Sequence, residues 1–192
     1  SQDGCQVLGR LISTGIGLAA GADAAGADGD GDGAGAGSEI DMVLLVAKTA
    51  AGEAVSKVLY SHLHDEAGME QACYAAHALA MDRDSCCQNL VSFGVLKSLP
   101  RVLQSLYNSR PVILWGLRAV CEICAADALH SDTLCSNGLC PTVVQALRCH
   151  TEDSIVVALG MRVCTFLAKS GANLKVLVQE RVHVSLAELL AS

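Results

Sequence analysis

The chain has 192 residues, of which 52% are hydrophobic but only 3% are aromatic. A core of this composition is built from Leu, Val, Ala and Cys, which suits closely packed helices better than an aromatic-rich β-sandwich. The net charge is −7, and lysine and arginine form no cluster. Nucleic acid and anionic membranes are therefore excluded as expected partners, because both require a concentrated basic face.

Ten cysteines are present, and several fall inside helical patterns. Cys73, Cys121, Cys124 and Cys164 lie among Ala, Val and Leu, where cysteine behaves as a small buried hydrophobic residue. This placement favours a reducing intracellular compartment, and we expect the cytoplasm. The sequence shows no signal peptide and no apolar run of the ~20 residues that a membrane span requires.

The first predicted unit, residues 5–63, contains a long interruption. A helical pattern over residues 7–20 is followed by residues 21–38, which consist almost wholly of Gly, Ala and Asp. Glycine loses the most backbone entropy on ordering, and this tract has no large apolar side chain to bury, so we expect a flexible insertion within one unit. The helical pattern returns over residues 40–62, with Gly52 predicted as a corner between two helices.

The second predicted unit, residues 66–109, has two candidate N-caps, Asp82 and Asp84, ahead of a short helix. Carboxylates at such positions accept hydrogen bonds from the first N–H groups of a helix. Gly94 predicts the corner at which this short helix ends. Longer helices are predicted on either side, over residues 70–81 and 95–107.

The third and fourth predicted units, residues 110–151 and 152–192, repeat the same order of helices. Pro111 is tolerated in a first helical turn. Asn137-Gly138 predicts the corner of the third unit, and Gly171 predicts a break in the fourth. Helices are predicted over residues 112–126, 132–136, 141–149, 153–169, 174–179 and 182–190.

These patterns recur at a spacing of 44 residues. Leu79 is repeated as Ile123 and Leu167, Gly94 as Gly138, and Arg118 as Arg162. A period of about 40–47 residues filled with helical pattern is typical of a helical solenoid. Since a solenoid unit cannot bury its apolar face alone, we expect each unit to stack on its neighbours and to expose a long surface for partners.

Two segments carry a resemblance to armadillo repeats. Residues 137–147, Asn-Gly-Leu-Cys-Pro-Thr-Val-Val-Gln-Ala-Leu, resemble the family pattern in which a glycine corner precedes a helix reading like Leu-Pro-x-Leu-Val-x-Leu-Leu. Residues 71–80 are similar to the family's long third helix. The resemblance implies an all-α fold, a right-handed α-solenoid of armadillo-like three-helix repeats, in a single domain over residues 1–192. HEAT repeats, with two helices per unit, are the close alternative.

The resemblance also implies a binding groove. Peptide-binding members of the family carry a ladder of Asn on each third helix, with Trp one turn earlier. By the 44-residue register, the Asn positions hold Ala78, Glu122 and Phe166, and the Trp positions hold Tyr74, Arg118 and Arg162. Without this ladder, recognition of a basic peptide is not expected. Arg118 and Arg162 would instead bind an acidic partner segment by charge-assisted hydrogen bonds, or be solvated, or pair with Glu122 and other acids nearby.

Other motifs are weaker. Residues 28–39 fit the spacing of an EF-hand calcium loop, but a Gly/Asp-rich tract produces this spacing by chance, and an acidic linker is expected. Cys121 and Cys124 resemble half of a zinc site, although their apolar neighbours favour a core position. Trp115 is expected to anchor the packing between units. Metals and cofactors are therefore not expected.

These observations predict a non-catalytic protein–protein interaction scaffold or adaptor, because no nucleophile elbow or phosphate loop is found. Its partner would be a protein or peptide, with an acidic segment as one candidate, bound along the groove. Two alternatives stay open: a regulatory repeat segment of a larger enzyme, and a structural component of a cytoskeletal or ciliary assembly. The chain begins at Ser1 without methionine, and we expect it to be a piece of a larger protein. The sequence leaves the oligomeric state open.

Overall fold

The computed structural model describes residues 36–61, 63, 65–82, 86–184 and 187. All regular secondary structure within these ranges is helical, as the composition predicts. The helices are α2 (Ala36–Ser61), α3 (Glu66–Met81), α4 (Cys86–Ser92), α5 (Val95–Ser105), α6 (Arg110–Ala126), α7 (Leu129–Ser136), α8 (Leu139–Cys149), α9 (Ser154–Leu167) and α10 (Gly171–Gln179).

The 44-residue period of the sequence is the spacing at which α3, α6 and α9 begin. The residues before these helices, Asp65, Ser109 and Asp153, share an extended N-cap conformation. The carboxylate of Asp65 accepts a hydrogen bond from the Gly68 N–H, and that of Asp153 accepts from two N–H groups in the first turn of α9. Each carboxylate satisfies donors that a helix start leaves without a partner in the helix.

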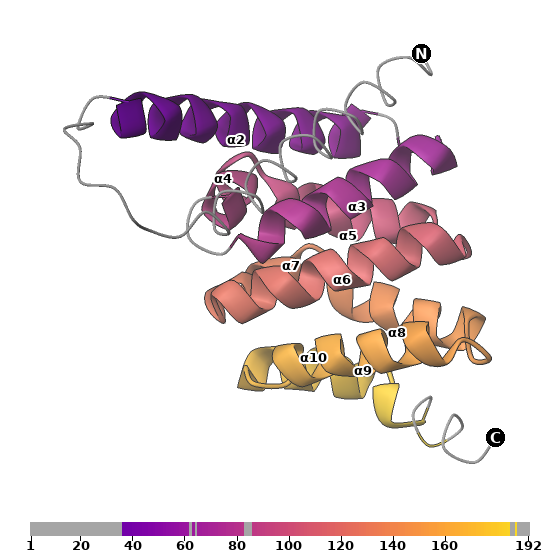
Figure 1. Ribbon diagram of the computed structural model, residues 1–192. Helices are drawn as coiled ribbons and strands as arrows, with labels where there is room; N and C mark the ends of the chain where they lie inside the picture. Colours follow the sequence, from indigo (N-terminus) through magenta and orange to yellow (C-terminus); the bar gives the residue numbers. More distant parts are fainter. Residues whose placement is uncertain (1–35, 62, 64, 83–85, 185–186, 188–192) are drawn as a thin grey trace.

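Successive groups of helices stack in chain order. Helices α3, α6 and α9 lie side by side, and the helices that follow each of them, α4–α5, α7–α8 and α10, lie behind this row (Figure 1). Helix α2 packs across α3, α4 and α5 at one end of the stack. One continuous core of Leu, Val, Ala and Cys side chains runs through these layers. We call α3–α5, α6–α8 and α9–α10 the first, second and third layers.

The corners that join short helices to long ones use a left-handed backbone. Gly94 and Gly138 have φ values of 89° and 90°, a conformation that glycine adopts without steric cost. Both corners confirm the sequence prediction. A third residue in this conformation, Arg181, has φ of 60° and lies just before Val182 of the last described helical turn.

Two further glycines permit close contact between layers. A Cβ atom on Gly116 of α6 would lie 2.3 Å from Cδ2 of Leu103 in α5. On Gly160 of α9 it would lie 2.7 Å from Cδ2 of Leu147 in α8. The two pairs are related by the 44-residue period, so the same close approach joins the first layer to the second and the second to the third.

The predicted corner at Gly52 is wrong. Helix α2 continues through Gly52 as far as Ser61. A Cβ atom there would lie 3.5 Å from Asn89 Cβ and 3.7 Å from the Phe93 ring, so this glycine is where α4 approaches α2. The predicted insertion at residues 21–38 also ends too late, because α2 begins at Ala36. Residues 21–35, like the predicted helix over residues 7–20, lie outside the described residues.

Smaller corrections concern helix ends. Helix α3 begins at Glu66 rather than at residue 70, because Asp65 caps it. The Asp82 carboxylate accepts from Lys48 Nζ at 2.6 Å, joining the end of α3 to α2, and from Cys86 Sγ at 3.4 Å at the start of α4. Asp84 lies outside the described residues. Gly171 is the first residue of α10 rather than a break before residue 174.

The buried cysteines belong to the core, as predicted. Burial raises the pKa of Cys73 to about 12, of Cys121 to about 11, of Cys124 to about 12 and of Cys164 to about 11. These groups are therefore neutral thiols near pH 7, which makes them poor nucleophiles and poor metal ligands. Within the described part of the chain, no helix has both the length and the apolar character to cross a lipid bilayer.

Candidate functional site

The five predicted groove residues fall into two contact groups on the row formed by α3, α6 and α9. Tyr74 and Arg118 belong to a group centred on Trp115, and Glu122, Arg162 and Phe166 form the other. Arg118 and Glu122 are one turn apart on α6, so the groups are neighbours. We call the surface carrying both groups the α3–α6–α9 face.

The first group is built around Trp115, which is partly buried. The rings of Tyr74 and Trp115 meet edge to face, with centroids 4.7 Å apart and planes 82° apart. The guanidinium carbon of Arg118 lies 4.7 Å from the Trp115 ring centroid, within the range of a cation–π contact. The Tyr74–Trp115 contact joins the first layer to the second, so the predicted role of Trp115 between units is confirmed.

The second group joins α6 to α9. Arg162 Nη2 lies 3.8 Å from Glu122 Oε1, and the Arg162 side chain is 52% exposed. The Phe166 ring has Arg162 Cζ at 5.9 Å and Lys169 Nζ at 4.8 Å from its centroid. With the two atoms 3.8 Å apart and Arg162 half exposed, this ion pair contributes little to stability, and Arg162 remains accessible to another carboxylate.

Of the two interpretations of the arginines, pairing with Glu122 is confirmed for Arg162. Arg118 instead stacks on Trp115. The interpretation in which both arginines bind an acidic segment stays a prediction. Lys169 was not among the predicted groove residues; it lies in the turn between α9 and α10.

The His77 ring lies beside the Trp115 ring. Its ring centroid lies 5.8 Å from that of Trp115, with the planes tilted by 35°. Its Nδ1 atom is buried and has no hydrogen-bond partner among the described residues. Desolvation lowers the pKa of His77, with a further lowering from Arg118 and an opposing effect from Glu122. The imidazole is therefore neutral near pH 7.

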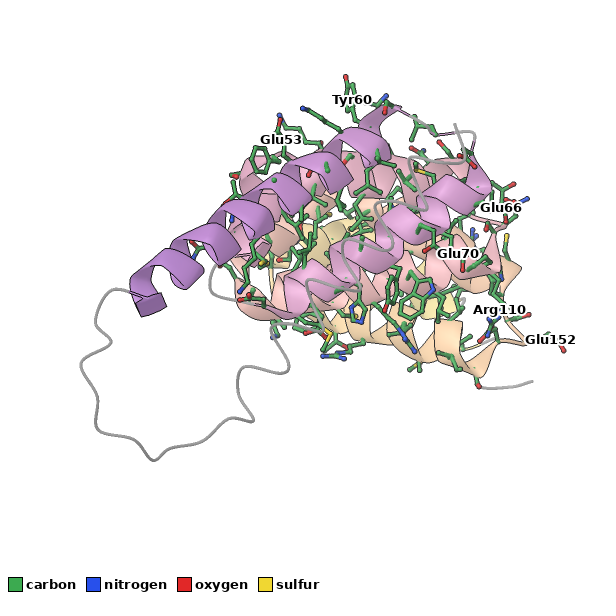
Figure 2. The ribbon with its side chains drawn as sticks, turned by 45° about the horizontal axis from the view of Figure 1, so that its top comes forward. Glu53, Tyr60, Glu66, Glu70, Arg110 and Glu152 are labelled. Atoms are coloured by element: carbon green, nitrogen blue, oxygen red, sulfur yellow. The ribbon has the colours of Figure 1, made fainter. Side chains whose placement is uncertain are left out.

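A surface rich in acidic side chains lies at the edge of the stack where α3, α6 and α9 begin. Figure 2 shows Glu66, Glu70, Arg110 and Glu152 gathered there. Ser109 Oγ donates to Glu66 Oε1 at 2.5 Å, and Arg110 Nε donates to Asp153 Oδ2. These contacts link one layer to the next, so the edge has a structural role.

The α3–α6–α9 face therefore offers three aromatic rings and three cations, with Glu122 as the acid beside them. The cations are Arg118, Arg162 and Lys169. Cation–π contacts and charge-assisted hydrogen bonds are the interactions that such a surface makes with a ligand. In a chain of net charge −7, the three cations outnumber the single acid in these two contact groups.

Comparison of the sequence with family models and with curated proteins finds no match. Function must therefore be argued from the described side chains and their arrangement.

Proposed function

We propose that this chain is a non-catalytic protein–protein interaction scaffold that binds an acidic segment of a partner protein along the α3–α6–α9 face. The observation that supports the proposal is the row of rings and cations across three stacked helices: Tyr74, Trp115 and Arg118, then Arg162, Phe166 and Lys169. The stacked layers support the finer fold that we propose with it, a right-handed α-solenoid of armadillo-like repeats. The buried thiols of Cys73 and Cys121 favour a cytoplasmic setting.

The stacked arginine suits this task. A guanidinium that lies over an aromatic ring uses its face for the cation–π contact, and its N–H groups stay in its plane, where they match a carboxylate. Arg118 over Trp115 has this arrangement. Because the ring already holds the guanidinium, less side-chain entropy is lost when a partner carboxylate binds.

Charge elsewhere on the chain supports the same site. The acidic edge with Glu66, Glu70 and Glu152 repels an acidic segment. An acidic ligand is therefore directed away from that edge and toward Arg118, Arg162 and Lys169. Association driven in this way weakens as ionic strength rises, because salt screens exposed charges.

The proposal is tested with a defined probe, a fluorescein-labelled peptide of alternating Glu and Leu residues, followed by fluorescence anisotropy at low salt. We expect binding that the double reversal Arg118→Glu/Arg162→Glu abolishes. The matched control is the double reversal Lys97→Glu/Arg148→Glu. It changes the net charge by the same amount, but these exposed residues lie on α5 and α8. A peptide with Lys in place of Glu serves as the specificity control.

Trp115 gives a second readout, since it is the single tryptophan of the chain. Binding at the face should change its emission in the unsubstituted protein. Equal loss of binding in the two double-reversal variants would mean that only net charge matters, and the proposal would be rejected. Binding that leaves Trp115 emission unchanged would place the acidic segment elsewhere.

A further inference from the structure

The third layer carries an uncovered apolar strip on the side away from the rest of the stack. Met161 of α9 is 40% exposed, and Leu174 and Val178 of α10 are 46% and 54% exposed. Val157, one turn before Met161 on α9, is partly exposed. We call Val157, Met161, Leu174 and Val178 the end face. In Figure 1, α9 and α10 lie at the end of the stack opposite α2.

Inner layers bury the same positions on the long helix. At the 44-residue spacing, Met161 corresponds to Leu117, which is 1% exposed, and to Cys73, which is fully buried. Val157 corresponds in the same way to Ile113 and Met69, both fully buried. Helix α6 packs on α3, and α9 packs on α6, so each inner long helix has a neighbour that α9 lacks on its outer side among the described helices.

The short helices show the same relationship with a shift of one residue. At a spacing of 43 residues, Leu174 and Val178 correspond to Ser131 and Cys135 of α7, which are 4% and 9% exposed. This spacing aligns the buried Leu177 of α10 with the buried Leu134 of α7. Positions that α7 buries are therefore exposed on α10, and they carry larger apolar side chains there.

The third layer and the turn that follows it carry more basic than acidic residues. Between residues 154 and 182 the chain carries Arg162, Lys169, Lys175 and Arg181, against the single acid Glu180. All four bases are exposed. An apolar strip with a basic rim is complementary to a ligand that has an apolar stripe and acidic flanks.

We propose that the end face docks an acidic amphipathic α-helix of a partner protein, laid along α9 as α9 lies along α6. The continuation of the interface that already joins α3 to α6 and α6 to α9 supports a helix as the occupant. The basic rim supports an acidic one. The proposal uses other apolar residues than the α3–α6–α9 face, although Arg162 and Lys169 are among the basic residues of both.

A second copy of the chain suits this surface less well. Two end faces meeting about a two-fold axis would bring identical patches together. The basic residues of one rim, such as Lys169 and Lys175, would then lie near the same residues of the other. Like charges placed opposite one another weaken such a contact.

The test uses a fluorescein-labelled stapled peptide of 14 residues, the length of α9, with Leu on one helical face and Glu on the others. We expect the full chain to bind it, and we expect Met161→Glu or Val178→Glu to weaken binding by about tenfold or more. The matched control is Leu129→Glu, because Leu129 is 71% exposed on α7, outside the end face. A stapled peptide of the same composition with the Leu positions scattered should not bind.

Circular dichroism checks that the variants keep their helices. Equal affinity of Met161→Glu and Leu129→Glu for the peptide would overturn the proposal, and so would equal binding of the scattered peptide. Sedimentation provides a further outcome. If the chain self-associates and Met161→Glu makes it monomeric, a second copy occupies the end face and the partner helix is rejected. The Arg118→Glu variant should bind the stapled peptide normally, which separates this proposal from the one above.

Discussion

Arg181 adopts the left-handed conformation of Gly138, 43 residues earlier in the chain, with φ of 60° against 90°. Both residues precede a helical turn that begins with a buried apolar residue, Val182 or Leu139. A side chain in this conformation costs about 1 kcal/mol relative to glycine. The third layer therefore has the same corner as the inner layers but without the residue that suits it.

We expect Arg181→Gly to raise the free energy of unfolding by about 0.5–1 kcal/mol, because it removes this strain at the cost of some added freedom in the unfolded chain. Urea denaturation followed by circular dichroism measures the change. The matched substitution Gly138→Ala should lower stability, since it introduces the strain that Arg181 now carries. A destabilised Arg181→Gly protein would show that contacts of the Arg181 side chain stabilise the fold by more than the strained backbone destabilises it.

Close contact between layers predicts an effect at Gly116. A Cβ atom there would lie 2.3 Å from Leu103 Cδ2, so Gly116→Ala should cost about 1–3 kcal/mol of stability by overpacking. Gly171→Ala is the control, because nothing lies within 4 Å of its Cβ position. Combining Gly116→Ala with Leu103→Val should recover part of the loss. Additive effects of the two substitutions would rule out this contact as the cause.

The sequence predicts the helices and their period because the signals are local. N-cap residues such as Asp153 and corner glycines such as Gly138 act within one or two turns of the chain. The continuity of α2 through Gly52 is not predictable in this way, because the residues that approach Gly52 are Asn89 of α4 and Phe93 just after α4. From the local sequence, a glycine in a helical pattern suggests that the helix ends there. Only the tertiary contact shows that Gly52 permits close packing instead.

Part of the candidate site could likewise be predicted from the sequence, and part could not. The period places Arg118 and Arg162 on equivalent positions, so their presence on one face could be predicted. The stacking of Arg118 on Trp115 and the ion pair of Arg162 with Glu122 could not, since both follow from side-chain conformations. The exposure of the end face also required the structure, because Met161 continues the same apolar pattern as the buried Leu117.

Burial of His77 predicts a pH dependence of stability. Desolvation holds the pKa of His77 below its ordinary value of 6.5 in the folded state. The unfolded chain therefore binds the proton first as pH falls, and the free energy of unfolding decreases below about pH 6.5. We expect His77→Gln to have a smaller loss of stability between about pH 7.5 and about pH 5.5 than the unsubstituted chain. Parallel slopes in urea denaturation at both pH values would exclude His77 as the source.

Thiol burial predicts selective reactivity. Cys149 is exposed, whereas Cys73 and Cys124 are buried and have pKa values raised to about 12. Since the thiolate is the reactive form, Ellman's reagent should modify Cys149 rapidly in the folded chain and the buried thiols only after unfolding. Cys149→Ser should remove one rapidly reacting equivalent. Rapid reaction of Cys73 or Cys124, identified by mass spectrometry, would mean that the layers open readily.

Glu122 is the acid that faces Arg162, with its side chain 18% exposed. If the α3–α6–α9 face binds acidic segments, Glu122 competes with the ligand for Arg162, and Glu122→Gln should raise affinity for the Glu/Leu peptide by about threefold to tenfold. The substitution keeps the shape of the side chain and removes only its charge. Glu70→Gln is the control, because it changes net charge equally at the acidic edge (Figure 2). The Glu122→Gln protein should also lose more affinity with added salt, because removal of the competing acid leaves a larger net charge attraction for salt to screen. Unchanged affinity in Glu122→Gln, measured by anisotropy at low salt, would place the peptide away from Arg162.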